Sequence, residues 1–232
     1  MQSIPPPFRA LVIGSSGTLG AALAAALESA SACSETVCLS RASDPEFDLA
    51  DPARTLAAAR RLAARGPFSI VLDATGVLAA DQRGPEKSLA ALEASRLERV
   101  MQINAFGPML MLRELLPALA PGRCIYGKLS ARVGSISDNR LGGWYAYRAS
   151  KAALNMLLQT AAIEIHRRRP EVVIAALQPG TVRSALSERF VAGRDDLTDV
   201  QESASGLLGA LDRLAPSAGA SFIDWRGQTI PW

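Results

Sequence analysis

Histidine and cysteine are scarce in this chain of 232 residues, and their scarcity excludes several kinds of chemistry. The single histidine, His166, cannot supply the histidine-centred triads of hydrolases or most zinc sites. The three cysteines are odd in number and are not spaced as metal ligands. We therefore expect no metal site, and reduced, mostly buried thiols in a cytoplasmic protein.

Long hydrophobic runs and dense charge are absent as well. No stretch approaches the roughly 18 uninterrupted apolar residues that a membrane span needs, and the N-terminal segment lacks a charged region followed by an apolar core. We expect neither a membrane partner nor a secretory signal. The net charge is only +3, and the arginine clusters at 60–61 and 167–169 are short, so we expect solvated helix ends and no nucleic-acid partner.

Apolar residues are plentiful. Hydrophobic residues make up 49% of the chain and charged residues 20%, as in ordinary globular proteins. A chain of this length buries most of its apolar surface without disulfides, which excludes disordered, collagen-like and disulfide-scaffold proteins. Because no repeat, low-complexity tract or Pro/Gly-rich linker divides the sequence, we expect a single domain over residues 1–232.

Short, continuous apolar runs alternate with segments rich in alanine and leucine. Continuous apolarity predicts strands covered on both faces, as in a parallel sheet. We expect strands at 9–13, 36–39, 69–72, 124–129, 172–177 and 221–225, and helices at 19–28, 53–64, 89–119, 145–168 and 200–214. This alternation predicts an α/β fold, a Rossmann-type doubly wound parallel sheet of about seven strands with helices on both faces.

The first expected strand ends in a glycine-rich turn that opens a helix. Gly14 permits the tight turn, Gly17 lets the backbone approach a pyrophosphate, and Gly20 lets the helix pack against the strand. The free N–H groups and the positive end of the helix would hold the phosphates. The alternative is a turn that merely needs glycine. The residues expected to bind the dinucleotide here are Gly14, Ser15, Ser16, Gly17, Thr18, Leu19 and Gly20.

The end of the second expected strand indicates which dinucleotide is favoured. It reads Leu39-Ser40-Arg41, with no carboxylate at the position where one would hydrogen-bond the ribose 2′-hydroxyl of NAD. A guanidinium at Arg41 would clamp a 2′-phosphate, with Ser40 supplying a hydroxyl. This favours NADP(H) over NAD(H), unless Arg41 is an ordinary surface charge.

A tyrosine and a lysine lie four residues apart in the expected helix 145–168. This spacing places Tyr147 and Lys151 on one face, whereas Tyr145 lies well off it. A phenol titrates near ~10 and is a poor acid–base catalyst at neutral pH, so we expect the lysine ammonium to lower its pKa. The pair could then protonate a carbonyl oxygen while hydride adds to the carbonyl carbon.

With these motifs, the chain resembles the short-chain dehydrogenase/reductase family, and most closely its small C-factor and sniffer-type carbonyl reductase branch. The resemblance covers nearly the whole sequence. It implies that Lys151 also holds the nicotinamide ribose. It further implies that adenine contacts Asp48 and Leu49, that the turn after Asp73 lies beside the ribose, and that the Pro-Gly turn carries the nicotinamide amide; the turn residues are Ala74, Thr75 and Gly76, and Pro179, Gly180, Thr181 and Val182.

Asn104 matches the fourth catalytic residue of that family. Pro108 has no N–H, so the carbonyl of Asn104 loses its helical partner and we expect a kink there. In the family a water held at this carbonyl relays protons between the lysine and solvent, and the resemblance gives Asn104 that role beside the cofactor. The alternative is that Asn104 merely tolerates a helix break.

The sequence departs from the family at the serine that hydrogen-bonds the substrate carbonyl. Alignment on Gly134 places Ala131 at that position. Ser130 could take over if the strand end shifts register, because neighbouring side chains of a strand point to opposite faces. We assign Ser130 to the role and keep Ser135 as the second candidate.

These residues predict an NADP(H)-dependent oxidoreductase of the carbonyl reductase type. Hydride would pass between nicotinamide and an aldehyde, ketone or alcohol, with Tyr147 as general acid/base. The alternative is an NADP(H)-binding regulatory protein with little or no turnover, which the displaced serine and the signalling role of some C-factor-like relatives favour. We expect residues 184–198, with Phe190 and Val191, to form a substrate-side loop, and 141–144 the opposite wall. Family resemblance implies a homodimer or homotetramer.

Overall fold

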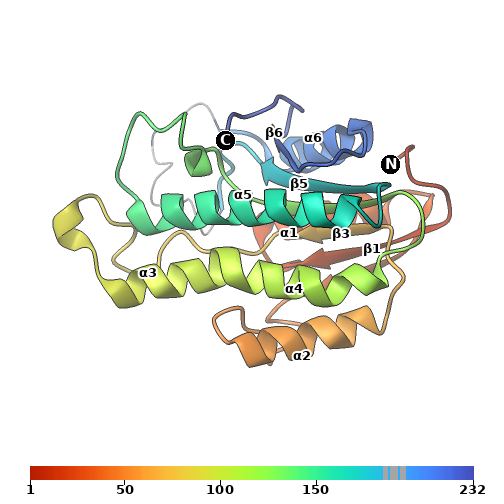
Figure 1. Ribbon diagram of the computed structural model, residues 1–232, viewed down its shortest axis with the longest axis horizontal. Coiled ribbons are helices and arrows are strands. Elements are labelled where there is room, and N and C mark those ends of the chain that lie inside the picture. The colour runs from red at the N-terminus through yellow and green to blue at the C-terminus, as the bar shows by residue number, and fades with distance from the viewer. Residues whose placement is uncertain (185–187, 189–192, 194–196) are drawn as a thin grey trace.

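Figure 1 shows the computed structural model, which describes residues 1–184, 188, 193 and 197–232. The strands are β1 (Phe8–Ile13), β2 (Cys33–Leu39), β3 (Ile70–Asp73), β4 (Cys124–Leu129), β5 (Val172–Gln178) and β6 (Ser221–Asp224). The α-helices are α1 (Thr18–Glu28), α2 (Pro52–Ala63), α3 (Ala94–Met101), α4 (Gly107–Leu115), α5 (Tyr145–His166) and α6 (Val200–Arg213). Short helical turns are η1 (Leu89–Ala91), η2 (Gln102–Phe106), η3 (Leu116–Ala118) and η4 (Arg132–Gly134).

The described residues form one parallel sheet of six strands in the order β2-β1-β3-β4-β5-β6. The predicted doubly wound fold is confirmed, but the predicted count of about seven strands is wrong. Each of the six strand ranges predicted from the sequence corresponds to an observed strand, and the expected seventh strand had no sequence range of its own.

The sheet is covered on both faces because successive strand residues point to opposite sides. In β1, Leu11 and Ile13 pack into the apolar cluster under α2, α4 and α5, whereas Ala10 and Val12 pack into the cluster beside α1 and α6. Helices α2, α4 and α5 cross one face side by side (Figure 1). Both faces of the sheet are therefore covered by apolar side chains. Polar side chains gather at the ends of the strands.

The predicted helix 89–119 begins later than expected, at Ala94, and it is irregular just before Pro108, where the irregularity was predicted. A turn of π-helix, η2, separates α3 from α4, and Gly107 N–H donates to the carbonyl of Gln102, five residues back. Pro108 follows immediately and cannot donate. Asn104 is fully buried at the centre of this turn. This turn therefore places a buried amide side chain between the loop after β3 and helix α5.

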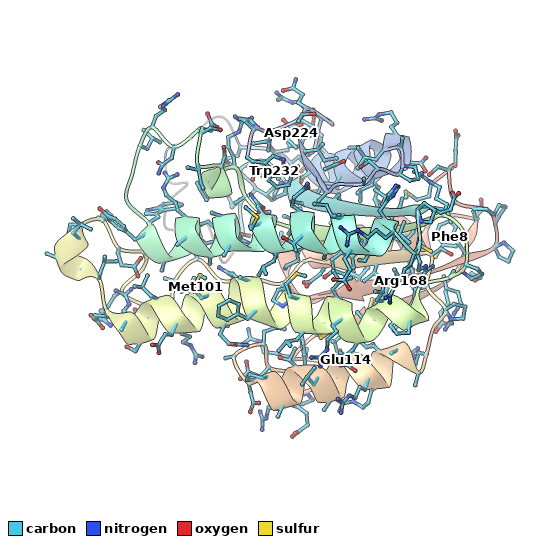
Figure 2. All side chains as sticks on the ribbon, viewed as in Figure 1. Phe8, Met101, Glu114, Arg168, Asp224 and Trp232 are labelled. Carbon is cyan, nitrogen blue, oxygen red and sulfur yellow. The ribbon has the colours of Figure 1, made fainter. Side chains whose placement is uncertain are left out.

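Two contacts hold helix α2 and the C-terminal residue against the rest of the fold. Glu114 of α4 pairs with Arg60 of α2 at 3.1 Å, on the side of α4 that faces α2 (Figure 2). Trp232 stacks on Phe222 of β6 with ring centroids 5.2 Å apart, and its carbonyl accepts a hydrogen bond from the Ser137 hydroxyl. Among the described helices, none combines the length and apolar character needed to cross a membrane.

Candidate active site

Two adjoining cavities lie at the carboxyl edge of the sheet, with volumes of about 820 and 720 Å³. The larger, here the edge cavity, runs from the β1–α1 turn past the ends of β3 and β4. The smaller, here the outer cavity, lies between the segment after β4 and the start of α5. Tyr147, Ser130 and Pro179 line both. A molecule lying in the edge cavity would therefore meet a second molecule beside Tyr147.

The glycine turn packs closely against neighbouring backbone. Gly14 has φ +82°, and a Cβ there would lie 3.0 Å from the backbone of Thr75. A Cβ at Gly20 would lie 2.1 Å from the carbonyl of Gly14, so only glycine lets α1 pack this closely. Helix α1 has no side-chain cap and no acidic residue in its first turn. Its free N–H groups can therefore hold an anion.

Arg41 lies at the same cavity. Its side chain is exposed, lines the edge cavity, and has no ion-pair partner among the described residues. The Ser40 hydroxyl is buried and instead accepts a hydrogen bond from Ser43 N–H at 3.2 Å. The arginine is thus available for a phosphate, while the serine is engaged with its own turn.

The predicted cofactor residues divide into two groups. Those that line the edge cavity are Gly17, Thr18, Leu19, Gly20, Arg41, Ala74, Thr75, Gly76, Tyr147, Lys151 and Pro179. Those that do not line it are Gly14, Ser15, Ser16, Ser40, Asp48, Leu49, Asn104, Gly180, Thr181 and Val182, although the last three line the outer cavity. The role of each as a cofactor contact stays a prediction.

Asn104 fixes the loop that follows β3. Its Oδ1 accepts from Val77 N–H and its Nδ2 donates to the Val77 carbonyl, both at 2.8 Å. Nδ2 also donates to the Ser150 hydroxyl of α5 at 3.0 Å. The side chain therefore joins this loop to the helix that carries Tyr147. Its predicted part in a proton relay stays a prediction.

Tyr147 and Lys151 lie one turn apart on the buried face of α5. Lys151 Nζ is 5.8 Å from the centre of the Tyr147 ring and donates to the Leu129 carbonyl at 3.0 Å. Burial raises the pKa of Tyr147 to about 12. The predicted lowering of this pKa by Lys151 is wrong in this structure, because desolvation of the phenolate dominates. Burial, reinforced by the Lys128 ammonium, lowers the pKa of Lys151 well below its usual value.

A second buried lysine, which the sequence analysis missed, supports the same edge. Lys128 Nζ lies 3.0 Å from Asp73 Oδ1 and donates to the Thr75 carbonyl at 2.6 Å, and both charged side chains are fully buried. Burial lowers the pKa of Lys128, and the Asp73 carboxylate opposes this effect. A charged residue inside an apolar strand could have signalled it. The pair holds the turn after β3 against the end of β4.

The structure places none of the candidate serine hydroxyls freely beside Tyr147. Ser130 Oγ is buried and donates to Asn155 Oδ1 at 2.6 Å, and Ser135 Oγ accepts from Asp138 N–H at 3.1 Å. Ala131 instead packs with Tyr147 and Leu78 in a small apolar cluster. The assignment of Ser130 as the carbonyl-orienting residue stays a prediction, and its hydroxyl would first have to leave Asn155.

Both apolar and charged side chains line the outer cavity. Leu141, Gly142 and Trp144 line it opposite the Pro-Gly turn, where the sequence places a substrate wall. Arg132 pairs with Asp138 at 2.9 Å, within the same lining. Most of the predicted substrate-side loop 184–198, with Phe190 and Val191, lies outside the described residues. Within the described part of the chain, no group of acidic, cysteine or histidine side chains is arranged to hold a metal ion.

Comparisons with known proteins agree with this geometry. The family model for short chain dehydrogenases matches residues 9–195, and the chain belongs to that family. It is thus a member of a family of oxidoreductases built on the Rossmann-type sheet.

Individual relatives are similar over most of the chain. The chain is 32% identical to C-signal of Myxococcus xanthus, over 72% of this chain and 94% of the relative. It is 30% identical to 1-hydroxy-2-glutathionyl-2-methyl-3-butene dehydrogenase of Rhodococcus sp. (strain AD45), over 82% of this chain and 80% of the relative.

Solved structures show the same fold. A short-chain dehydrogenase/reductase of Burkholderia multivorans with bound NADP superposes with a TM-score of 0.80 and 26% identity, over 98% of this chain and 100% of that one. The NADPH-bound carbonyl reductase from chicken fatty liver superposes with a TM-score of 0.83 at 22% identity, over 98% and 100% of the two chains. The latter likeness concerns the fold alone.

Proposed function

We propose that the protein is an NADP(H)-dependent oxidoreductase that interconverts a small aldehyde or ketone and its alcohol. The observation that carries the proposal is the position of Tyr147 at the junction of the two cavities, with Lys151 beside it. The 26% identical structure with bound NADP and the 30% identical dehydrogenase support the same chemistry.

The edge cavity would hold the coenzyme. The N-terminus of α1 would hold its pyrophosphate, Arg41 a 2′-phosphate, and the turn at Gly76 its ribose. When bound, the coenzyme supplies or accepts the hydride at the carbonyl carbon. The turn has the tight form that such a group requires, because a Cβ at Gly20 would lie 2.1 Å from the Gly14 carbonyl, and α1 begins without a side-chain cap on its N–H groups.

In the reduction, Tyr147 donates its phenolic proton to the carbonyl oxygen, which gains negative charge as hydride reaches the carbon. A phenol with a pKa of about 12 carries its proton at neutral pH, but it is a weaker acid than an exposed tyrosine, so the transfer depends on the negative charge that develops on the carbonyl oxygen. Lys151 then helps to return a proton to the Tyr147 phenolate. Burial makes the Lys151 ammonium a better acid than a solvated lysine. In alcohol oxidation the same groups act in reverse.

The decisive experiment is Tyr147→Phe. Purified protein is mixed with NADPH and a panel of small aldehydes, ketones and quinones, and NADPH consumption is followed by absorbance. We expect turnover by the wild type and a loss of at least about 100-fold in Tyr147→Phe, because the general acid is removed. Tyr145→Phe is the matched control on the same helix and should keep its activity.

A second test addresses the coenzyme. Arg41→Asp should weaken NADPH binding by roughly 10- to 100-fold, because charge-assisted hydrogen bonds worth about 1.5–3 kcal/mol are removed. NADH binding should change little, and both affinities can be measured by titration calorimetry. Equal affinities for NADPH and NADH in the wild type would contradict the preference.

A regulatory protein with little turnover is the second candidate function. It is favoured by the 32% identity to C-signal and by the engaged hydroxyl of Ser130. NADPH binding without reduction of any carbonyl in the panel would support it over the enzyme. The cytoplasmic location and the homodimer or homotetramer stay predictions; exposed apolar side chains on α5, Met156 and Ile163, are compatible with such an assembly.

A further inference from the structure

A carboxamide at the end of β5 offers a hydrogen-bond donor to the outer cavity. Gln178 lines this cavity together with Tyr147, Ser130 and Ala131. Ala131 presents only a methyl group there, and the Ser130 hydroxyl is bound to Asn155. A carbonyl oxygen that accepts a proton from Tyr147 has a second lone pair, which also takes a donor. The inference that follows rests on the proposed function.

The orientation of the carboxamide is fixed by its neighbour. The backbone N–H of Arg132 donates to Gln178 Oε1 at 2.9 Å. A backbone N–H can only donate, so the carboxamide atom that faces it is the oxygen and the NH₂ group lies on the other side. This NH₂ group has no acceptor among the described residues, and the side chain is half-buried.

The register of the sheet places the side chain on the correct face. Leu129 pairs with Leu177, and Ser130 N–H donates to the Leu177 carbonyl at 2.8 Å, so Gln178 lies alongside Ser130. Ala176, two residues before Gln178, packs into the apolar cluster under α5. Because strand side chains alternate, Gln178 shares that face with Ala176, and α5 is the helix that carries Tyr147.

The cationic side chains of the outer cavity are engaged or exposed, with Lys87 among the exposed ones. The Arg132 guanidinium pairs with Asp138, and Arg148 donates to the backbone carbonyls of Gly142 and Gly143. Arg140 is exposed at the mouth. We propose that Gln178 Nε2 is the donor that orients and polarises the substrate carbonyl oxygen opposite the Tyr147 hydroxyl.

The test compares two substitutions at this position. Gln178→Glu keeps the size of the side chain and the acceptor for Arg132 N–H but replaces the NH₂ donor by an oxygen. Gln178→Leu removes both groups. With NADPH and 4-nitrobenzaldehyde, we expect kcat/KM to fall by roughly 100-fold in each, as for removal of one donor to a developing oxyanion. The affinity for NADPH should stay unchanged.

Gln159→Leu is the matched control. Gln159 Oε1 also accepts a backbone N–H, that of Ala220 at 2.8 Å, but Gln159 lines neither cavity. Its kcat/KM should equal that of the wild type. A rescue follows from the same reasoning. Gln178→Leu combined with Ala131→Ser supplies a hydroxyl beside Tyr147, and its kcat/KM should be roughly tenfold higher than that of Gln178→Leu alone.

Binding of benzamide, whose carbonyl is not reduced, gives a readout independent of turnover. It can be followed through the fluorescence of Trp144, which lines the same cavity. Both Gln178 variants should bind benzamide at least about tenfold more weakly than Gln159→Leu. Wild-type kcat/KM and benzamide affinity in the Gln178 variants would overturn the inference while leaving the proposed function intact. A wild type that reduces no carbonyl overturns the proposed function instead, and benzamide binding then still decides the role of Gln178.

Discussion

Two lysine ammonium groups are buried at the end of β4, and each depends on a different kind of partner. Lys151 has a backbone carbonyl, that of Leu129, whereas Lys128 has the carboxylate of Asp73. A buried charge without its counter-charge is costly. It has lost its hydration, and no ion pair in the low-dielectric interior compensates for that loss. The Lys128–Asp73 pair is therefore the more sensitive to substitution of the two.

Lys128→Met should lower the free energy of unfolding by about 3–5 kcal/mol, because it leaves the Asp73 carboxylate buried and unpaired. The double variant Lys128→Met with Asp73→Asn should recover at least half of this loss. Urea unfolding measures both, with Lys87→Met as a control on an exposed lysine. Equal losses in the single and the double variant would show that the ion pair is not the source.

Burial of the Tyr147 phenol links stability to pH. Its pKa in the folded protein is raised to about 12, above the ~10 of an unfolded chain. The folded state therefore holds its proton where the unfolded state loses it, so the stabilisation is complete below pH ~10 and is lost as the pH rises toward ~12.

Between pH 9 and pH 11 the wild type should lose about 1.4 kcal/mol more unfolding free energy than Tyr147→Phe. The difference isolates this group, because the other buried tyrosine, Tyr126, is present in both proteins. Urea unfolding at the two pH values measures it. Parallel pH dependence of the two proteins would mean that the phenol titrates in the folded state as it does in the unfolded one.

At the scale of elements, the start of α5 is held by a residue from far away in the sequence. Trp144, the residue before the helix, adopts a left-handed backbone with φ 52° and provides no side-chain cap. Glu86 Oε2 accepts from Ala146 N–H at 3.0 Å, and the Glu86 carbonyl accepts from Trp144 N–H. Arg96 of α3 lies 3.8 Å from the other oxygen of Glu86. Glu86 therefore fixes the start of α5 and, with it, the position of Tyr147 in the first turn of that helix.

Glu86→Ala should reduce kcat roughly tenfold or more, because a small displacement of an acid–base group is costly, while the affinity for NADPH stays unchanged. Glu86→Gln keeps an oxygen that can accept from Ala146 N–H and should retain most of the activity. Glu164→Ala, an exposed position of the same helix, is the control. If Glu86→Gln loses as much kcat as Glu86→Ala, the backbone contact is not what positions Tyr147.

The sequence predicts most elements well because the apolar runs and the glycine turn are local signals. The strand β4 and the helices α1, α2 and α5 begin and end within a few residues of the expected positions. The irregular turn η2 lies just before Pro108, the local signal from which it was predicted. The Asp73–Lys128 pair was not predictable, because its partners are 55 residues apart and only the register of β3 on β4 brings them together. The same holds for Glu86, 60 residues from Ala146.

At the scale of the whole molecule, the parallel order of the strands decides where chemistry is possible. The carboxyl ends of all six strands meet at one edge. The chain places β2 on one side of β1 and β3 on the other, so the strand order switches at β1. Ligands of such sheets bind in the crevice at this switch point. At the opposite edge, Phe68 and Leu119 form a backbone bridge. The fold thus separates the edge that carries the two cavities from the opposite edge.

Hydrogen exchange with and without NADPH tests this separation. The bound dinucleotide should slow deuterium uptake at 14–20, 73–77 and 128–131, because these segments border the edge cavity, and the added stability at ~100 times Kd is about 2.7 kcal/mol. Segments 64–69 and 119–123 at the opposite edge are internal controls and should change least. Arg41→Asp should reduce the protection at the same NADPH concentration. Protection concentrated at 64–69 and 119–123 would place the coenzyme at the wrong edge and remove the basis for Tyr147 as its catalytic partner.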